Sequence, residues 1–317
     1  MAILNAKGFL KGGIGELVFR NFRGKQVIQA KPKKSTPTAG SVGSSLEFGL
    51  CSASAKVMRE AFGAVVSGYD GAMINRFNGV VRNSLTACRN KVCGERDLHD
   101  ADLSFYHGFQ FNQNSPVDKV LKIKPKAEID EDCRLRLTIP SFSADEILGI
   151  KSYYFKIRFL AISFDFKAEC YRYHRVKDIR LKGAERFEGE ELELDLEVPK
   201  GRMLLLSMSL HAYSVNNLGE EVNLNTTQWN PAEIIGGWHI PPDEEVEQIR
   251  AEGRESTLVT PLDFPSSHDR GSFLKRFREL REDTQESHQA SSRHKEEPIP
   301  KWPKDDLPGG DIGFRKG

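Results

Sequence analysis

Between residues 44 and 112, apolar residues recur at spacings of three and four, which places them on one face of a helix. The first set follows a candidate N-cap at Ser44 or Ser45 and comprises Phe48, Cys51, Ala55, Met58 and Phe62. The second set follows a break over residues 63–71 and comprises Met73, Phe77, Val80 or Val81, Leu85 and Cys88. The pattern predicts an antiparallel pair of helices with these stripes in the core.

From about residue 116 to residue 229 the apolar period changes to two, the period of a strand with one buried face. Leu135, Leu137 and Ile139 alternate with polar residues, and residues 191–198 alternate acidic and apolar side chains. Seven or eight such short segments follow one another with no helix between them. Residues 113–240 are therefore predicted to form an antiparallel β-sandwich of immunoglobulin-like size, and the fold class of the chain is α+β.

Residues 153–166 change phase within one strand pattern. The apolar residues are odd-numbered from Tyr153 to Phe159 and even-numbered from Leu160 to Phe166. We expect a β-bulge in this segment to absorb the one-residue slip. Near the start of residues 203–210 both odd-numbered and even-numbered positions are apolar, which indicates a central strand with two buried faces.

At the N-terminus, residues 14–20 and 25–30 are rich in β-forming residues and flank the turn-forming run Asn21-Phe22-Arg23-Gly24. They predict a β-hairpin, with a glycine cluster before it and a linker after it. Residues 1–43 are thus a basic, Gly-rich hairpin and linker, followed by the helix pair over residues 44–112. The glycines fit neither the dinucleotide nor the P-loop pattern, because those place glycines between a strand and a helix.

Residues 241–317 read as a charged tail. Thirty of the 77 residues are charged and few are aromatic, so the segment buries too little surface to offset its chain entropy. We expect the tail to be mostly disordered, with short helices near residues 243–252 and 269–282. The second of these carries a small apolar stripe, Phe273, Phe277 and Leu280, which we expect to bind the body of the protein or a partner.

The net charge is +1, from 46 basic and 45 acidic residues, so only the distribution of charge carries information. Residues 1–40 hold eight basic residues and one acidic residue. Five cysteines, an odd number spread over a long chain, favour a reducing compartment. No signal-peptide core or membrane span is recognisable. We expect no membrane segment and a location in the cytoplasm, or inside a phage particle or secretion apparatus.

Motifs for catalysis or metal binding are weak. Cys88, Cys93, His99 and His107 lie within twenty residues, but seven residues separate the two histidines, whereas structural zinc sites usually separate paired histidines by three to five. We therefore expect no metal there and no cofactor. No nucleophile or zinc-protease motif is recognisable, so no catalytic residue is assigned.

A row of basic residues runs along the hairpin and its exit and suggests a nucleic-acid-binding surface. Its members, interleaved with Phe19 and Phe22, are Arg20, Arg23, Lys25, Lys31, Lys33 and Lys34. Cations of this kind contact phosphates and aromatic rings stack on bases. Lysine and arginine are also common on exposed edge strands, where they prevent pairing with other chains, and this is the alternative interpretation of the row.

The run Gly13-Ile-Gly-Glu-Leu-Val-Phe-Arg-Asn-Phe-Arg-Gly-Lys-Gln-Val-Ile-Gln-Ala-Lys-Pro32 resembles the N-terminus of a family of bacterial proteins found mainly in Bacteroidota. Residues 73–85, Met-Ile-Asn-Arg-Phe-Asn-Gly-Val-Val-Arg-Asn-Ser-Leu, look like the second helix of that family. The resemblance covers residues 8–90 and implies a hairpin, then helices, then a β-rich C-terminal half. It implies no activity.

Three functions stay open on this evidence. The first is a non-enzymatic structural or interaction module with a protein partner, in a phage or secretion setting. The second is a nucleic-acid-binding protein that uses the basic hairpin. The third is a metal-dependent enzyme, and the absence of a motif counts only weakly against it because catalytic groups converge in space.

Overall fold

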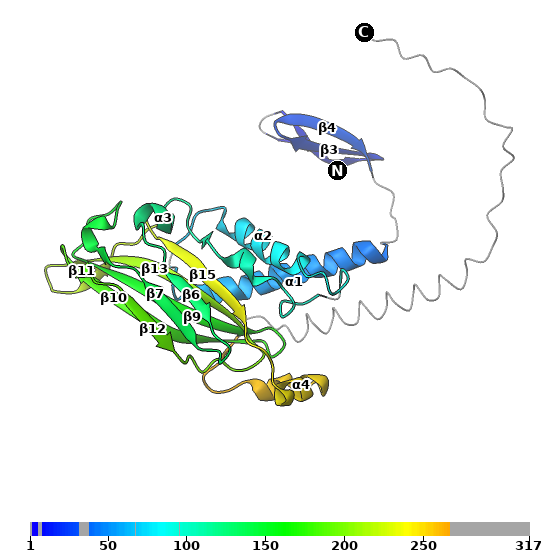
Figure 1. The fold of residues 1–317 in the computed structure, drawn as a ribbon. Coiled ribbons are helices and arrows are strands. Elements are labelled where there is room, and N and C mark those ends of the chain that lie inside the picture. The colour runs from blue at the N-terminus through cyan, green and yellow to red at the C-terminus, as the bar shows by residue number, and fades with distance from the viewer. Residues whose placement is uncertain (1, 6–7, 32–37, 67, 95, 267–317) are drawn as a thin grey trace, which may run out of the picture. The chain divides into compact units, whose positions relative to one another are not determined.

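The structure is a computed structural model, and it describes residues 2–5, 8–31, 38–66, 68–94 and 96–266. The chain divides into two compact units, Met1–Ser41 and Val42–Gly317, and each is described by itself (Figure 1). Among the described residues, none of the helices is both long and apolar enough to cross a membrane.

The first unit contains one antiparallel sheet of four strands in chain order, β1 to β4. The strands are β1 (Ala2–Leu4), β2 (Leu10–Ile14), β3 (Leu17–Phe22) and β4 (Lys25–Ala30). The predicted hairpin is β3 and β4, joined by Arg23 at φ 49° and Gly24 at φ 78°. Two consecutive positive φ angles are what a tight type I′ hairpin turn requires. The glycine cluster expected before the hairpin lies partly inside β2.

Two long helices open the second unit, α1 (Ala39–Phe62) and α2 (Met73–Thr86). Met73, Phe77, Val81 and Leu85 of α2 are all buried, as the three-and-four spacing predicts. The stripe on α1 is buried from Cys51 onward. Its expected first member, Phe48, is 63% exposed, so the prediction is wrong at that position.

The large sheet has the strand order β16-β10-β9-β13-β15-β5, with β14 paired to β13, and all of its pairings are antiparallel. Its strands are β5 (Phe109–Gln110), β9 (Tyr154–Asp165), β10 (Cys170–Lys182), β13 (Met203–Val215), β14 (Glu221–Asn223), β15 (Ala232–His239) and β16 (Phe264–Pro265). A second sheet has the order β12-β7-β6. Its strands are β6 (Lys126–Ile129), β7 (Leu135–Ile139) and β12 (Glu190–Leu194).

Smaller elements complete the second unit. Strands β8 (Phe142–Ser143) and β11 (Arg186–Phe187) form a two-stranded pair. The short helix α3 (Val117–Val120) precedes the second sheet. Single 3₁₀ turns are η1 (Leu103–Tyr106), η2 (Ala144–Glu146) and η3 (Glu255–Leu258).

The large sheet is a middle layer, and this explains the phase change along residues 153–166. Ile162 and Phe164 of β9 share a core with α1 and α2, whereas Ile157 and Phe159 share a core with the second sheet. Alternate side chains thus reach two different covered faces. The prediction of a bulge in β9 is wrong. Odd-numbered and even-numbered residues of this strand are both buried, and its pairing with β13 has no register shift. The register shift lies in the neighbouring strand β10, between Arg175 and Lys177.

The antiparallel sheets expected over residues 113–240 are present, but their strands are not all short. β9, β10 and β13 have 12, 13 and 13 residues. The immunoglobulin-like arrangement is not confirmed, because the helices cover one face of the large sheet. The helix pair and that sheet, expected as separate domains over residues 44–112 and 113–240, share one hydrophobic core.

The short helix predicted near residues 243–252 is confirmed, whereas the expectation of disorder is wrong for the rest of residues 241–266. This segment contains α4 (Glu244–Ala251), η3 and the strand β16, which pairs with β10. The side chain of Asp243 accepts the N–H of Val246 and so caps α4. Residues 267–317, to which the rest of that expectation applies, lie outside the described residues.

Candidate interaction surfaces

The N-terminal sheet has two chemically different faces. Cross-strand partners share a face and neighbours along a strand alternate, so the strand register assigns every strand residue to one of the two faces. The uncharged face consists of Ala2, Leu4, Leu10, Gly12, Ile14, Leu17, Phe19, Asn21, Gln26, Ile28 and Ala30. The basic face consists of Ile3, Lys11, Gly13, Val18, Arg20, Phe22, Lys25, Val27 and Gln29.

The uncharged face is open. Leu4, Ile14 and Ile28 are 64%, 55% and 57% exposed. None of the described residues between 2 and 31 is buried, so this unit has no core of its own among them. Small sheets need a second layer over an apolar face to be stable in water. The uncharged face is therefore a candidate interaction surface.

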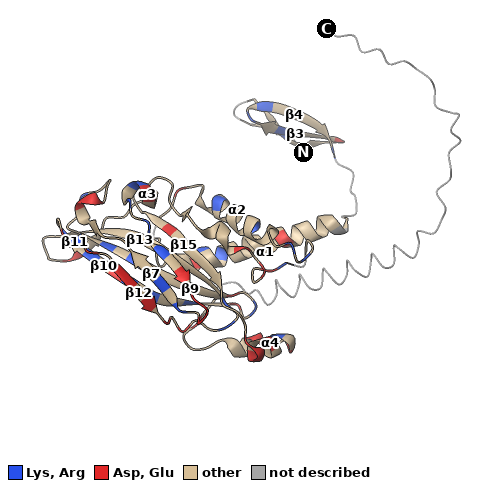
Figure 2. Cartoon of the chain, viewed as in Figure 1, with Lys and Arg blue, Asp and Glu red and all other residues tan. Residues whose placement is uncertain are grey.

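The predicted basic row is only partly brought together. Arg20 and Lys25 lie on the basic face with Phe22, which is 55% exposed, and Figure 2 shows basic residues along this hairpin. The guanidinium of Arg23, in the turn, lies 5.3 Å from the centre of the Phe22 ring. Lys31 follows β4 and is exposed. Lys33 and Lys34 lie outside the described residues, as do Phe273, Phe277 and Leu280 of the predicted partner-binding stripe.

Three of the four residues considered for zinc, Cys93, His99 and His107, contact separate partners. Cys93 Sγ lies 3.8 Å from Ser44 Oγ, and His99 Nε2 lies 3.8 Å from Asp165 Oδ1. His107 Nδ1 is 2.8 Å from the carbonyl oxygen of Ile235. Within the described part of the chain, no three metal-binding side chains of the His, Cys, Asp or Glu type are grouped to hold an ion.

Two serine–histidine pairs have the spacing of a nucleophile and its base, a feature that the sequence did not indicate. Ser163 Oγ lies 2.9 Å from His174 Nε2, and Ser209 Oγ lies 2.9 Å from His211 Nε2. The two serines are 0% and 1% exposed. Nucleophilic attack needs a substrate within reach of the hydroxyl, so in this conformation both pairs satisfy buried polar atoms instead.

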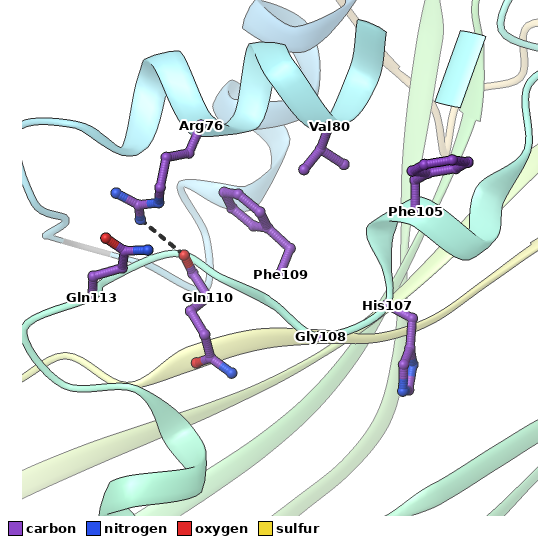
Figure 3. A pocket seen from close by; sticks show the side chains of 8 residues that line it. All are labelled: Arg76, Val80, Phe105, His107, Gly108, Phe109, Gln110 and Gln113. Atoms are coloured by element: carbon purple, nitrogen blue, oxygen red, sulfur yellow. Dashed lines mark hydrogen bonds between the residues drawn. The ribbon is translucent and has the colours of Figure 1, made fainter. Parts of the chain in front are cut away.

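A recess of about 320 Å³ lies between α2, η1 and β5 (Figure 3). Its cation, Arg76, is paired: two of its nitrogens donate to Asp70 at 2.6 and 2.8 Å, and one of them also donates to the carbonyl oxygen of Gln110 at 3.0 Å. The hydrogen bonds from Arg76 hold the pKa of Asp70 well below its usual range. Arg76 therefore clamps the loop before α2 to β5.

Comparison with known proteins adds no assignment. No protein-family model matches the chain, and neither a curated protein nor a solved structure is similar to it. The function must therefore be argued from the surfaces themselves.

Proposed function

We propose that this protein is a non-enzymatic structural or interaction module that assembles through its N-terminal sheet. The partner is a second copy of the chain, bound by the uncharged face. The observation that carries the proposal is that a four-stranded sheet with one face free of charge has no buried residue between positions 2 and 31 among those described.

Charge placement favours a second copy as the partner. The cations Lys11, Arg20 and Lys25 all lie on the opposite face, and Arg23 lies in a turn. Two uncharged faces can pack together without bringing these positive charges into contact. A two-fold interface of this kind uses the same patch on both copies, and two sheets packed face to face bury both apolar surfaces.

The test compares two neighbouring residues of β1 that point to opposite faces. Leu4, on the uncharged face, is 64% exposed and Ile3, on the basic face, is 65% exposed. Analytical ultracentrifugation of the full chain should show a concentration-dependent dimer. Leu4→Glu should raise its dissociation constant at least about tenfold, equivalent to about 1.4 kcal/mol, because it places a charge in the apolar interface.

Ile3→Glu is the matched control and should leave the dimer intact. Ile28→Glu, in β4 on the uncharged face, should act like Leu4→Glu. Circular dichroism of each variant checks that the second unit stays folded. A chain that stays monomeric at all concentrations, or equal effects at positions 3 and 4, would refute assembly through this face.

Nucleic-acid binding is the second candidate, and the basic face favours it. Arg20, Lys25 and the exposed Phe22 share that face, and Arg23 adds a cation at its end. Cations beside an exposed aromatic ring are the elements of a single-strand-binding surface. The two proposals use opposite faces of the same sheet, so variants can separate them.

A further inference from the structure

The face of the large sheet that carries the helices is only partly covered. Along β9, Ile162 and Phe164 lie under α1 and α2, whereas Lys156 and Arg158 on the same face are partly exposed. At this border lies a recess of about 300 Å³. Its volume is at the lower end of the range found for small-ligand sites.

The inner part of the recess is apolar. Leu160 of β9, 5% exposed, and Ala64, just after α1, line it. Tyr173 of β10 forms one wall and is held in place because its hydroxyl donates to the carbonyl oxygen of Ala61 at 2.9 Å. Phe264 of β16 forms another wall and meets the Tyr173 ring edge to face at 5.3 Å. The docked segment 241–266 thus completes the recess.

The rim is positively charged. Arg158 donates to both oxygens of Asp178, at 3.0 and 3.3 Å, and Lys156 contacts the same carboxylate at 2.9 Å. Burial raises the pKa of Asp178, but hydrogen bonds from Arg158 and Lys156 outweigh it, and the pKa stays below its usual value. The single carboxylate of Asp178 is therefore paired with two cations, which leaves this group with a net positive charge.

Arg175 is the remaining cation at the rim. It is exposed and forms no hydrogen bond or ion pair with any described residue. It pairs with Leu160 across the sheet, immediately before the register shift in β10. Because of that shift, Asp178 lies on the same face of the sheet as Arg175. Arg175 therefore borders both the apolar recess and the Arg158–Asp178 ion pair.

We propose that this recess binds a carboxylate carried on an aromatic body, with Arg175 holding the carboxylate and Tyr173 and Phe264 contacting the ring. A planar guanidinium with unused donors matches a carboxylate, which accepts two parallel hydrogen bonds. Aromatic rings pack edge to face or offset against such walls. The ligand is a small aryl acid or the carboxyl terminus of a peptide that ends in an aromatic residue.

Charge argues against the chain's own predicted stripe as the occupant. Phe273, Phe277 and Leu280 are accompanied in sequence by Lys275, Arg276 and Arg278. Those cations would be brought toward a rim that already has an excess of positive charge. An anion from outside this stripe suits the rim better.

Calorimetric titration of the full chain tests the proposal with 3-phenylpropionate, and with N-acetylphenylalanine as a mimic of a peptide terminus. We expect saturable binding with a dissociation constant of about 1 mM or tighter, as ligands of this size allow. The neutral amide of 3-phenylpropionate should bind at least about tenfold more weakly, because it loses the charge-assisted hydrogen bonds. Acetate should fail to bind, because it lacks the ring.

Arg175→Gln should weaken binding of both acids at least about tenfold. The matched control is Arg89→Gln, since Arg89 is also exposed and unpaired among the described residues. Phe264→Ala should weaken binding of the aromatic acids, and thermal melts confirm that the variant stays folded. Absence of saturable binding, or equal affinity of the Arg175→Gln variant, would overturn the proposal. The recess lies wholly in the second unit, so the result is independent of the dimer test.

Discussion

Arg202 and Asp263 form a buried ion pair that joins the residue just before β13 to the segment after α4. Arg202 Nη1 lies 2.6 Å from Asp263 Oδ1 and Nη2 lies 3.1 Å from Oδ2, with the two side chains 1% and 0% exposed. Arg172 of β10 donates to both oxygens of the same carboxylate at 3.0 and 3.1 Å. Strand β10 and the residue before β13 thus share one carboxylate, which lies 61 residues beyond Arg202 in the chain.

The first prediction is that Asp263→Asn strongly destabilises the second unit. Removing the carboxylate leaves Arg202 buried without its anion, and breaking a buried pair in this way costs about 3–5 kcal/mol. Urea unfolding of the full chain, followed by tryptophan fluorescence, measures the loss. Glu252→Gln is the control, because its pair with Arg254 is exposed and should change the unfolding free energy by less than about 1 kcal/mol.

Limited proteolysis gives an independent measure of the same pair. Arg250 donates to the carbonyl oxygen of Gly201 at 2.7 Å and is well shielded. Trypsin should cut after Arg250 slowly in the wild type and faster in the Asp263→Asn variant, because loss of the pair releases the segment. Equal cleavage rates in the two proteins would show that the pair does not hold the segment.

The second prediction concerns pH. Burial lowers the pKa of His174 and of His211 to about 4, from an ordinary value near 6.5. The unfolded chain therefore binds more protons than the folded chain between these values. The resulting stability is complete above about pH 6.5 and is lost as the pH falls toward 4, at up to about 1.4 kcal/mol per pH unit for each histidine.

Urea unfolding between pH 7 and pH 4.5 measures that dependence. His174→Gln should flatten the slope by up to about one proton, because glutamine does not titrate. A slope that is unchanged in this variant would contradict a neutral, buried His174. Below about pH 4 a further loss is expected from Asp263. Burial raises the pKa of Asp263, but hydrogen bonds from Arg202 and Arg172 outweigh it and hold the pKa well below its usual range.

The third prediction separates the two candidate functions of the N-terminal sheet. If the sheet only assembles the protein, nucleic acid should bind no tighter than about 10⁻⁴ to 10⁻⁶ M at physiological salt, the range of non-specific attraction. Fluorescence anisotropy with single-stranded and duplex oligonucleotides measures this. Submicromolar binding would favour the nucleic-acid proposal if the triple variant Arg20→Gln, Arg23→Gln, Lys25→Gln abolished it and flattened the salt dependence by up to about three units.

Periodicity predicted the elements whose burial follows from one repeating face. Met73, Phe77, Val81 and Leu85 are buried on α2 as their spacing requires, and the alternation of Leu135, Leu137 and Ile139 placed a strand correctly. The phase change along β9 was misread because a sequence pattern records which positions are apolar but not how many layers cover a sheet. With helices on one face and strands on the other, both parities become apolar without a bulge.

The sequence predicted the helix near residues 243–252, but the docking of segment 241–266 on the large sheet was not predicted, for a different reason. The segment is rich in charged residues, and a prediction from composition assumes that every charged side chain faces solvent. Asp263 is instead buried by two arginines that lie 61 and 91 residues away in sequence. Local signals were present, since Asp243 caps α4 and Phe264 is aromatic, but they are too short to predict docking.

The amino-acid sequence by itself determined the helix pair, the antiparallel strands and the basic hairpin, because each depends on local periodicity or turn chemistry. Only the tertiary structure decided which charges are paired. Arg202 and Arg172 both have Asp263 as a partner, whereas Arg175 has no carboxylate partner among the described residues. Pairing depends on distances between segments far apart in the chain, and neither composition nor spacing encodes those distances.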